Sequence, residues 1–235
     1  MSFAHMAFAW TLPLSDLLSA LGVSASVASL ALLLTTPFAL ITGLQLARMR
    51  GPMRGLALGL VLVPMVLPPV VIGFGLLTLF GTRGLLGGLL SALHIRLAFH
   101  FLGAVLAASC VGFPLFALSA KSAFESVDPR LEEMARTLGD SQWKAFRRVT
   151  LPLASRALGA GATLFFARAL GEFGATMIFA GDAPGSTRTL ALATYAALQR
   201  PDGDVDALAL CAASLVLSAL AIAVHLGLTR GARDV

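Results

Sequence analysis

The sequence predicts an all-α integral membrane protein that crosses the bilayer about five times. Hydrophobic residues make up 57% of the 235 residues and charged residues only 12%, against about 45–50% and about 25% in soluble domains. Apolar runs long enough to cross a bilayer, which takes about 20 residues, occur repeatedly along the chain. A soluble fold lacks the polar surface to cover so many apolar side chains, so a membrane is the expected solvent.

We expect one transmembrane domain, residues 1–235, rather than several domains. The segment before the first span, residues 1–16, contains no Lys or Arg. It therefore lacks the positive start of a signal peptide, and we expect it to be retained. The first span is long enough to tilt or to extend beyond the lipid. The predicted spans are residues 17–46, 56–80, 98–120, 157–180 and 205–228, with a long connection at 121–156.

Positive charge alternates between the connections. Twelve of the 17 Lys and Arg residues lie after the first span, between the third and fourth spans, or at the C-terminal end. Lys and Arg are retained on the cytoplasmic side of membranes, so we expect the N-terminus outside and the C-terminus in the cytoplasm. The net charge of +5 is spread between spans rather than gathered on one element. This distribution argues for contact with membrane lipid and against binding of nucleic acid.

The connection at 121–156 is the most informative segment. Asp128 and Pro129 fit the N-cap and the first position of a helix, and Gly139 fits its left-handed end. A second short helix is expected to start at Asp140. Charged side chains cover one part of the first helix (Glu132, Glu133, Arg136), and apolar ones recur at helical spacing on one face (Leu131, Met134, Ala135, Leu138).

The apolar face of such a helix has two interpretations. It either occupies a groove on a partner protein or rests on lipid headgroups. The residues by themselves favour neither.

The same connection resembles a family motif. Glu133-Met134-Ala135, three residues, Gly139, nine residues and Val149-Thr150-Leu151-Pro152 are similar to the EAA loop of ATP-binding-cassette (ABC) importer permeases. That loop reads E-A-A-x3-G-x9-I-x-L-P, with Met134 and Val149 as apolar replacements here. The resemblance implies the type I ABC importer fold and a coupling helix that seats on an ATPase subunit. It implies that role for Leu131, Glu132, Glu133, Met134, Ala135, Arg136, Leu138 and Gly139.

ATP chemistry is expected on a separate polypeptide. The sequence contains no G-x-x-x-x-G-K-[ST] loop to hold phosphates. The chain is therefore expected to be a transport subunit rather than an enzyme.

Three prolines interrupt the second predicted span. Pro64, Pro68 and Pro69 remove helix hydrogen bonds. Within a bilayer such an interruption persists only where protein or a water-filled cavity satisfies the freed carbonyls. We interpret the segment as a kinked helix that lines a pathway, and a kink used only for packing is the alternative.

The fourth predicted span carries two charges. Arg168 and Glu172 are four residues apart, so they can pair on one helix face. Ionisable residues at this depth are functional candidates, and a gate or subunit contact is one interpretation, with a structural pair as the other. A carboxylate repels an anion, so Glu172 is not expected to bind one. The other pathway candidates here are Gly171, Phe173, Gly174 and Thr176.

Two segments narrow the resemblance. Residues 168–176, Arg-Ala-Leu-Gly-Glu-Phe-Gly-Ala-Thr, and residues 186–190, Ser-Thr-Arg-Thr-Leu, resemble molybdate permeases within the sulfate/molybdate group of ABC importers. Sulfate relatives more often have Tyr at the position of Phe173. The resemblance implies molybdate as substrate, with tungstate and sulfate as alternatives. It also implies that the chain lies in the bacterial cytoplasmic membrane as a homodimer. The implied partners are two ATPase subunits and a periplasmic or lipid-anchored binding protein.

Other classes of function have less support in the sequence. Cys110 and Cys211 lie in separate apolar runs, and the four histidines are scattered, so no metal site or cofactor is expected. An ion-coupled secondary transporter would need interrupted helices in both halves, whereas the prolines interrupt only one span. A membrane enzyme would need a group of acids, bases or ligands that the sequence does not show.

Overall fold

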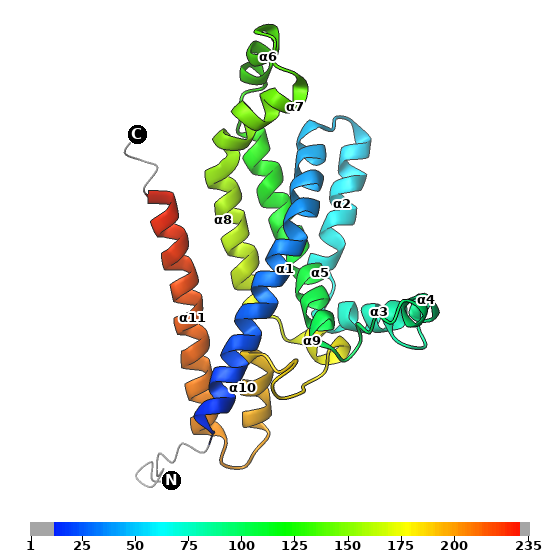
Figure 1. Ribbon diagram of the computed structural model, residues 1–235, viewed down its shortest axis with the longest axis vertical. Coiled ribbons are helices and arrows are strands. Elements are labelled where there is room, and N and C mark those ends of the chain that lie inside the picture. The colour runs from blue at the N-terminus through cyan, green and yellow to red at the C-terminus, as the bar shows by residue number, and fades with distance from the viewer. Residues whose placement is uncertain (1–11, 231–235) are drawn as a thin grey trace.

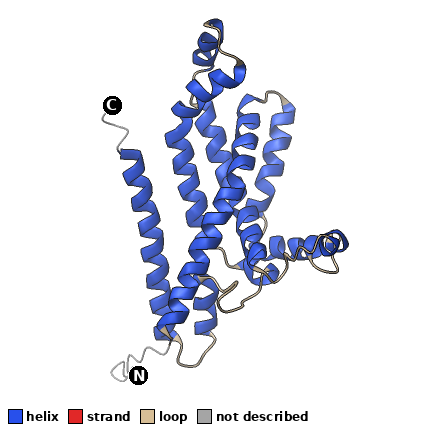
Figure 2. Ribbon diagram, viewed as in Figure 1, coloured by secondary structure: helices blue, strands red, loops and turns tan. Residues whose placement is uncertain are grey.

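The computed structural model describes residues 12–230, with side chains described up to Ala223, and every regular element in that range is a helix (Figure 2). The predicted all-α class is confirmed. Residues 1–11 and 231–235, which include both termini, lie outside the described residues. The helices are α1 (Leu14–Arg48), α2 (Pro52–Val66), α3 (Pro69–Phe80), α4 (Gly87–Ala92), α5 (Phe101–Glu125), α6 (Pro129–Thr137), α7 (Gln142–Ala145), the π-helical turn η2 (Phe146–Thr150), α8 (Leu151–Leu170), α9 (Gly174–Phe179), α10 (Leu190–Leu198) and α11 (Asp204–Arg230).

Four helical stretches of the described chain are long and apolar enough to cross a membrane. They are α1, α5, the continuous stretch Gln142–Leu170 that runs through η2 into α8, and α11. The pair α2 and α3 supplies a fifth if the two helices together form one broken span. The other stretches overlap predicted spans closely, whereas Gln142–Leu170 begins inside the predicted connection 121–156 and ends ten residues before the end of the predicted span 157–180.

Small residues form the centre of the bundle. Helix α1 packs along α5, and α5 packs along α8 (Figure 1). Small side chains at helix interfaces let backbones approach closely inside a membrane, where packing rather than the hydrophobic effect holds helices together. A Cβ on Gly43 of α1, for example, would lie 2.6 Å from Cβ of Ala120 on α5. Alanines on the facing sides of α1 and α5 are at most 1% exposed (Ala28, Ala31, Ala39, Ala104, Ala108, Ala117).

The second predicted span is broken rather than kinked. Helix α2 ends at Val66, α3 begins at Pro69, and the two axes meet at 103°. Leu67 and Pro68 are extended, with ψ of 140° and 136°, because a residue that precedes proline is pushed out of the helical region. Helix α3 and the short α4 consequently project sideways from the bundle (Figure 1).

The fourth predicted span also differs from the expectation. A single helix was expected over residues 157–180, but α8 ends at Leu170 and a separate helix, α9, begins at Gly174. Gly171, which follows the last residue of α8, has φ of −86°, so the break does not require a left-handed glycine. The prolines interrupt one span, as expected, but this second break, which contains no proline, was not predicted from the sequence.

The connection between α5 and α8 stands at one end of the molecule. Helices α6 and α7 lie beyond the ends of α1, α2, α5 and α8, whereas α9 and α10 lie toward the opposite end (Figure 1). The turn between α1 and α2 lies at the same end as α6. The basic residues at and beside this turn are Arg48, Arg50 and Arg54. The two ends thus differ in charge as the sequence predicts.

Candidate functional site

Helix α6 begins and ends at the residues that the sequence indicates. The Asp128 carboxylate accepts a hydrogen bond from the backbone N–H of Arg130 at 2.9 Å, and Pro129 is the first helical residue. At the other end Gly139 has φ of +97°, a left-handed conformation that a residue with a Cβ adopts only at a cost. The backbone N–H of Asp140 donates to the Ala135 carbonyl at 3.1 Å, which satisfies a carbonyl at the helix end.

One face of α6 is apolar and uncovered. Leu131, Met134 and Leu138 are 42%, 61% and 87% exposed. This face, which we call the α6 ridge, lies beyond the ends of the spans (Figure 1). No described residue covers it.

The second short helix starts one residue later than expected. The hydroxyl of Ser141, not the carboxylate of Asp140, accepts the backbone N–H of Lys144, at 3.4 Å. Asp140 instead forms ion pairs with Lys144 and Arg148. The hydrogen bond from Lys144 holds the pKa of the Asp140 carboxyl below its ordinary value.

The Leu-Pro pair at the end of the motif changes the helix type. Pro152 has no N–H to donate to the carbonyl four residues earlier. The N–H of Leu151 bonds to the carbonyl of Phe146, five residues back, so η2 is a π-helical turn. Such turns are rare and often occur at functional sites. Here the turn joins α7 to α8 without a break in the helical stretch.

The two adjacent glutamates of α6 face different surroundings. Glu132 is bound by Nη2 of Arg48, at 2.9 and 3.1 Å from its two oxygens, and by the hydroxyl of Thr150 at 2.8 Å. Glu133 is exposed and forms no ion pair with any described residue. Sequence reasoning did not find the partners of Glu132, because Arg48 lies 84 residues earlier in the chain.

The two helix breaks meet in space. A Cβ built on Gly174, at the start of α9, would lie 3.1 Å from Cβ of Pro69 at the start of α3. A Cβ on Gly73 would lie 2.7 Å from the carbonyl oxygen of Ala175. Two of the predicted pathway residues, Pro69 and Gly174, are therefore in contact. The glycines are required by the close approach of α3 and α9.

Glu172 links the end of α8 to the start of α9. Its Oε1 accepts the backbone N–H of Ala175 at 2.8 Å, and its Oε2 lies 2.8 Å from Nη1 of Arg168. The Arg168 N–H is not directed at Oε2, so that contact is electrostatic rather than a hydrogen bond. Glu172 is 2% exposed. The predicted pair thus exists within one chain, and it also holds the break between the helices.

The remaining pathway candidates are distributed around these breaks. The ring of Phe173 lies 5.1 Å from that of Tyr195 on α10, and Thr176 is buried. Gly171 and Pro68 are exposed. Pro64 lies apart from them and lines a cavity of about 660 Å³ between α1, α2 and α5.

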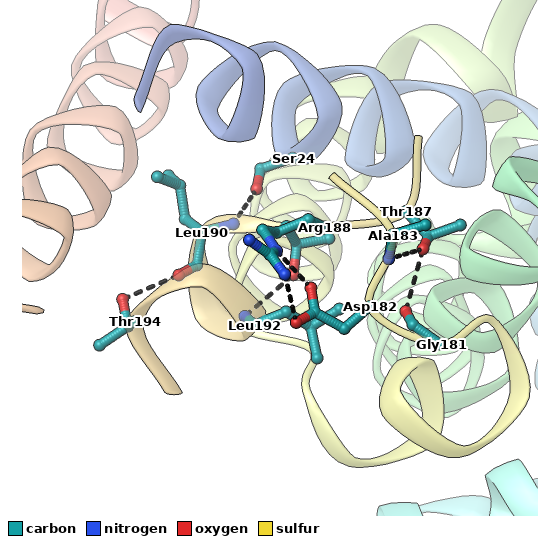
Figure 3. Close-up of polar contacts among 10 residues, drawn as sticks. Ser24, Gly181, Asp182, Ala183, Thr187, Arg188, Leu190, Leu192 and Thr194 are labelled. Carbon is teal, nitrogen blue, oxygen red and sulfur yellow. Dashed lines mark hydrogen bonds and ion pairs between the residues drawn. The ribbon is translucent and has the colours of Figure 1, made fainter. Parts of the chain in front are cut away.

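The loop between α9 and α10 is held by polar contacts (Figure 3). Asp182 accepts two hydrogen bonds from the guanidinium of Arg188, at 2.6 and 2.9 Å. The Thr187 hydroxyl accepts the N–H of Ala183 at 2.9 Å and donates to the carbonyl of Gly181 at 3.0 Å. The Ser24 hydroxyl of α1 accepts the N–H of Leu190 at 2.7 Å. The Ser-Thr-Arg-Thr-Leu segment therefore fixes this loop to α1.

Comparison with known proteins identifies a transport family and similar permeases. The family described as "Binding-protein-dependent transport system inner membrane component" matches residues 35–233. The molybdenum transport system permease protein ModB of Escherichia coli (strain K12) is 41% identical over 213 residues, 90% of this chain and 93% of that one. The ModB protein of Mycobacterium tuberculosis (strain ATCC 25618 / H37Rv) is 43% identical over 214 residues, 90% and 79% of the two chains.

A sulfate permease and a solved importer are also similar. The sulfate transport system permease protein CysT of Escherichia coli (strain K12) is 36% identical over 183 residues, 77% of this chain and 66% of that one. A bacterial ABC transporter that imports alginate has a TM-score of 0.70 at 16% identity, over 95% of this chain and 81% of that one. At this identity the likeness concerns the fold alone, which is that of an ABC importer transmembrane domain. The chain belongs to the family of binding-protein-dependent transport system inner membrane components.

Proposed function

We propose that this chain is the permease subunit of an ATP-driven molybdate importer. The observation that carries the proposal is the exposed α6 ridge, on a helix with the spacing of the EAA loop. The identity of 41% to a molybdenum permease over 90% of the chain supports the substrate. Molybdate is a dianion, so it crosses a bilayer only through a protein pathway.

The ridge is the contact with the motor. An amphipathic helix that stands beyond the membrane and exposes Leu138 at 87% is suited to a groove on a partner. The partner is the ATPase subunit, which supplies the hydrolysis that this chain lacks. Glu133, which is exposed next to the ridge, completes the contact. The side that carries α6 is the cytoplasm, as the basic connections on that side also indicate.

The pathway runs between two copies of the chain, with the paired breaks of α2–α3 and α8–α9 near it. ATP binding draws the two α6 helices together, and the spans then open to the opposite side. There the loop of Asp182 and Arg188 faces a binding protein that delivers the anion. A solved alginate importer is described in complex with a periplasmic protein, which supports this arrangement for the fold.

The permease itself contributes little to the choice of anion. Arg168 of α8 is paired with Glu172, so its charge is balanced before an anion arrives. Selectivity between tetrahedral oxyanions therefore rests mainly with the binding protein.

Sulfate is the second candidate, because a sulfate permease is 36% identical over 77% of this chain. The test is reconstitution of the chain with its ATPase and binding protein in proteoliposomes. Molybdate should stimulate ATP hydrolysis at lower concentration than sulfate, with tungstate as a third arm. Equal or stronger stimulation by sulfate would reject the molybdate assignment.

The contact with the ATPase has its own test. Charge reversal in Glu133→Lys should abolish uptake and reduce recovery of the ATPase with the tagged permease. The matched control for ATPase recovery is Asp202→Lys, which reverses an exposed charge in the connection between α10 and α11, at the far end of the molecule. Unchanged uptake by Glu133→Lys would remove the coupling assignment.

A further inference from the structure

Glu132 and Glu133 are neighbours in sequence with opposite environments. Glu133 is exposed, as a residue that contacts a partner must be. The Glu132 side chain is only 16% exposed and is directed toward Arg48 and Thr150. A residue occupied in this way within the chain is not free to bind the ATPase.

The contacts of Glu132 join three elements. Arg48 is the last residue of α1, Thr150 is the last residue of η2, and Glu132 is in the first turn of α6. The hydroxyl of Thr150, which is 5% exposed, donates to Oε2. Arg48 donates to both carboxylate oxygens. Glu132 is thus the point where the coupling segment meets both the central helix and the start of α8.

Helix α6 has few other links to α1. Its backbone packs on α7 and η2. A cavity of about 210 Å³ lies between α6 and the ends of α1 and α5, lined in part by Ala47, Phe124 and Pro129. The side chains of Glu132 and Arg48 are also on the lining of that cavity. Beside this cavity, the ion pair of Glu132 and Arg48 joins α6 directly to α1.

We propose that Glu132 is a positioning residue that transmits the displacement of α6 to α1 as well as to α8. The inference rests on the proposed function. Motion of α6 reaches α8 through the packing of α6 on α7 and η2, which continue into α8 as one helical stretch. It also reaches α1 directly through the ion pair of Glu132 and Arg48, and α1 packs on α5, α8 and α10. Without the carboxylate this direct link is lost, and α1 follows α6 only through the packing of α5 and α8.

Stability of the fold is a separate matter. Arg48 is 44% exposed, and ion pairs of this kind contribute little to stability. Glu132→Gln keeps the size of the side chain and an oxygen that accepts the Thr150 hydroxyl. The variant is therefore expected to fold and to insert as the wild type does.

The test compares Glu132→Gln with Glu133→Gln in the complete importer. Permease, ATPase and binding protein are reconstituted, and molybdate uptake, ATP hydrolysis and ATPase recovery are measured on the same samples. We expect Glu132→Gln to reduce the molybdate transported per ATP about fivefold, with ATPase recovery unchanged. Glu133→Gln should instead reduce ATPase recovery. Arg50→Gln removes an exposed charge of the same connection as Arg48 and should match the wild type.

Two further variants separate positioning from loss of structure. Thr150→Val removes the hydroxyl at nearly constant size and should lower the same ratio by about twofold. The exchange Arg48→Glu with Glu132→Arg reverses the pair, and the Thr150 hydroxyl can accept from the new guanidinium, so transport per ATP should recover.

The outcomes are distinct. The inference is overturned if Glu132→Gln transports as much molybdate per ATP as the wild type. It is also overturned if the charge exchange fails to restore transport per ATP. Loss of ATPase recovery in Glu132→Gln also overturns it, because Glu132 would then be a docking residue. If the wild-type chain recovers no ATPase at all, the proposed function fails instead.

Discussion

Truncation of Leu138 gives the most direct measure of the α6 ridge. Leu138 is 87% exposed, so Leu138→Ala removes almost nothing from the chain's own packing. If the ridge is buried by the ATPase, the variant loses the burial of three carbon groups. At about 0.8 kcal/mol per group, scaled by the exposed fraction, the loss is about 2 kcal/mol, or about 30-fold in Kd.

The assay is a titration of labelled ATPase subunits onto the permease in lipid nanodiscs. Leu85→Ala is the matched control, because Leu85 is 81% exposed and lies beside α4, away from α6 (Figure 1). The control should bind as the wild type does. A Kd for Leu138→Ala within twofold of the wild type, or an equal loss in Leu85→Ala, would refute the docking of this ridge.

Three further predictions concern the stability of the candidate site. Gly139→Ala forces a side chain into φ of +97° with no neighbour within 4 Å, so strain of about 1 kcal/mol should speed hydrogen exchange in α6. Gly73→Ala places a Cβ 2.7 Å from the backbone of α9 and should lower the midpoint of thermal unfolding in detergent, whereas Gly75→Ala, with open space around it, should not. Glu172→Gln leaves Arg168 unpaired while 34% of the arginine remains exposed. We expect a loss of about 2 kcal/mol in thermal unfolding, below the range for fully buried pairs, with partial recovery when Arg168→Gln is added.

The fold class and the α6 segment follow from local rules. The length of each apolar run predicts a span, because a run is defined by consecutive residues alone. The start of α6 at Asp128 and its end at Gly139 are also local, since a cap and a left-handed glycine act within one turn. The start of α7 shows the limit of this reasoning. Asp140 and Ser141 are both favourable N-cap residues, so residue preference does not choose between them. The ion pairs of Asp140 with Lys144 and Arg148 leave Ser141 as the N-cap.

The second helix break could not be read from the sequence in the same way. Prolines mark the α2–α3 break, but the α8–α9 break contains none. Its residues, Gly171 to Gly174, lie inside an apolar run that a length rule counts as one span. The contacts of Glu172 with Arg168 and with the start of α9 are local, but the approach of Gly174 to Pro69 is tertiary and is not visible in the sequence. The same holds for Glu132, whose partners come from distant parts of the chain.

Helix α8 connects the α6 segment to both helix breaks. The helical stretch that starts at Gln142 and ends at Leu170 has 29 residues and is about 43 Å long at 1.5 Å per residue. One end carries Thr150, bound to Glu132, and the other end carries Arg168, bound to Glu172. Glu172 in turn holds the start of α9, which packs on α3 beyond the proline break. A packed helix moves as a unit rather than deforming along its length. If α6 is the coupling helix, as proposed, its displacement should reach the junction of the two breaks through polar contacts at both ends of α8, and disruption of either end should weaken transport without removing the ATPase.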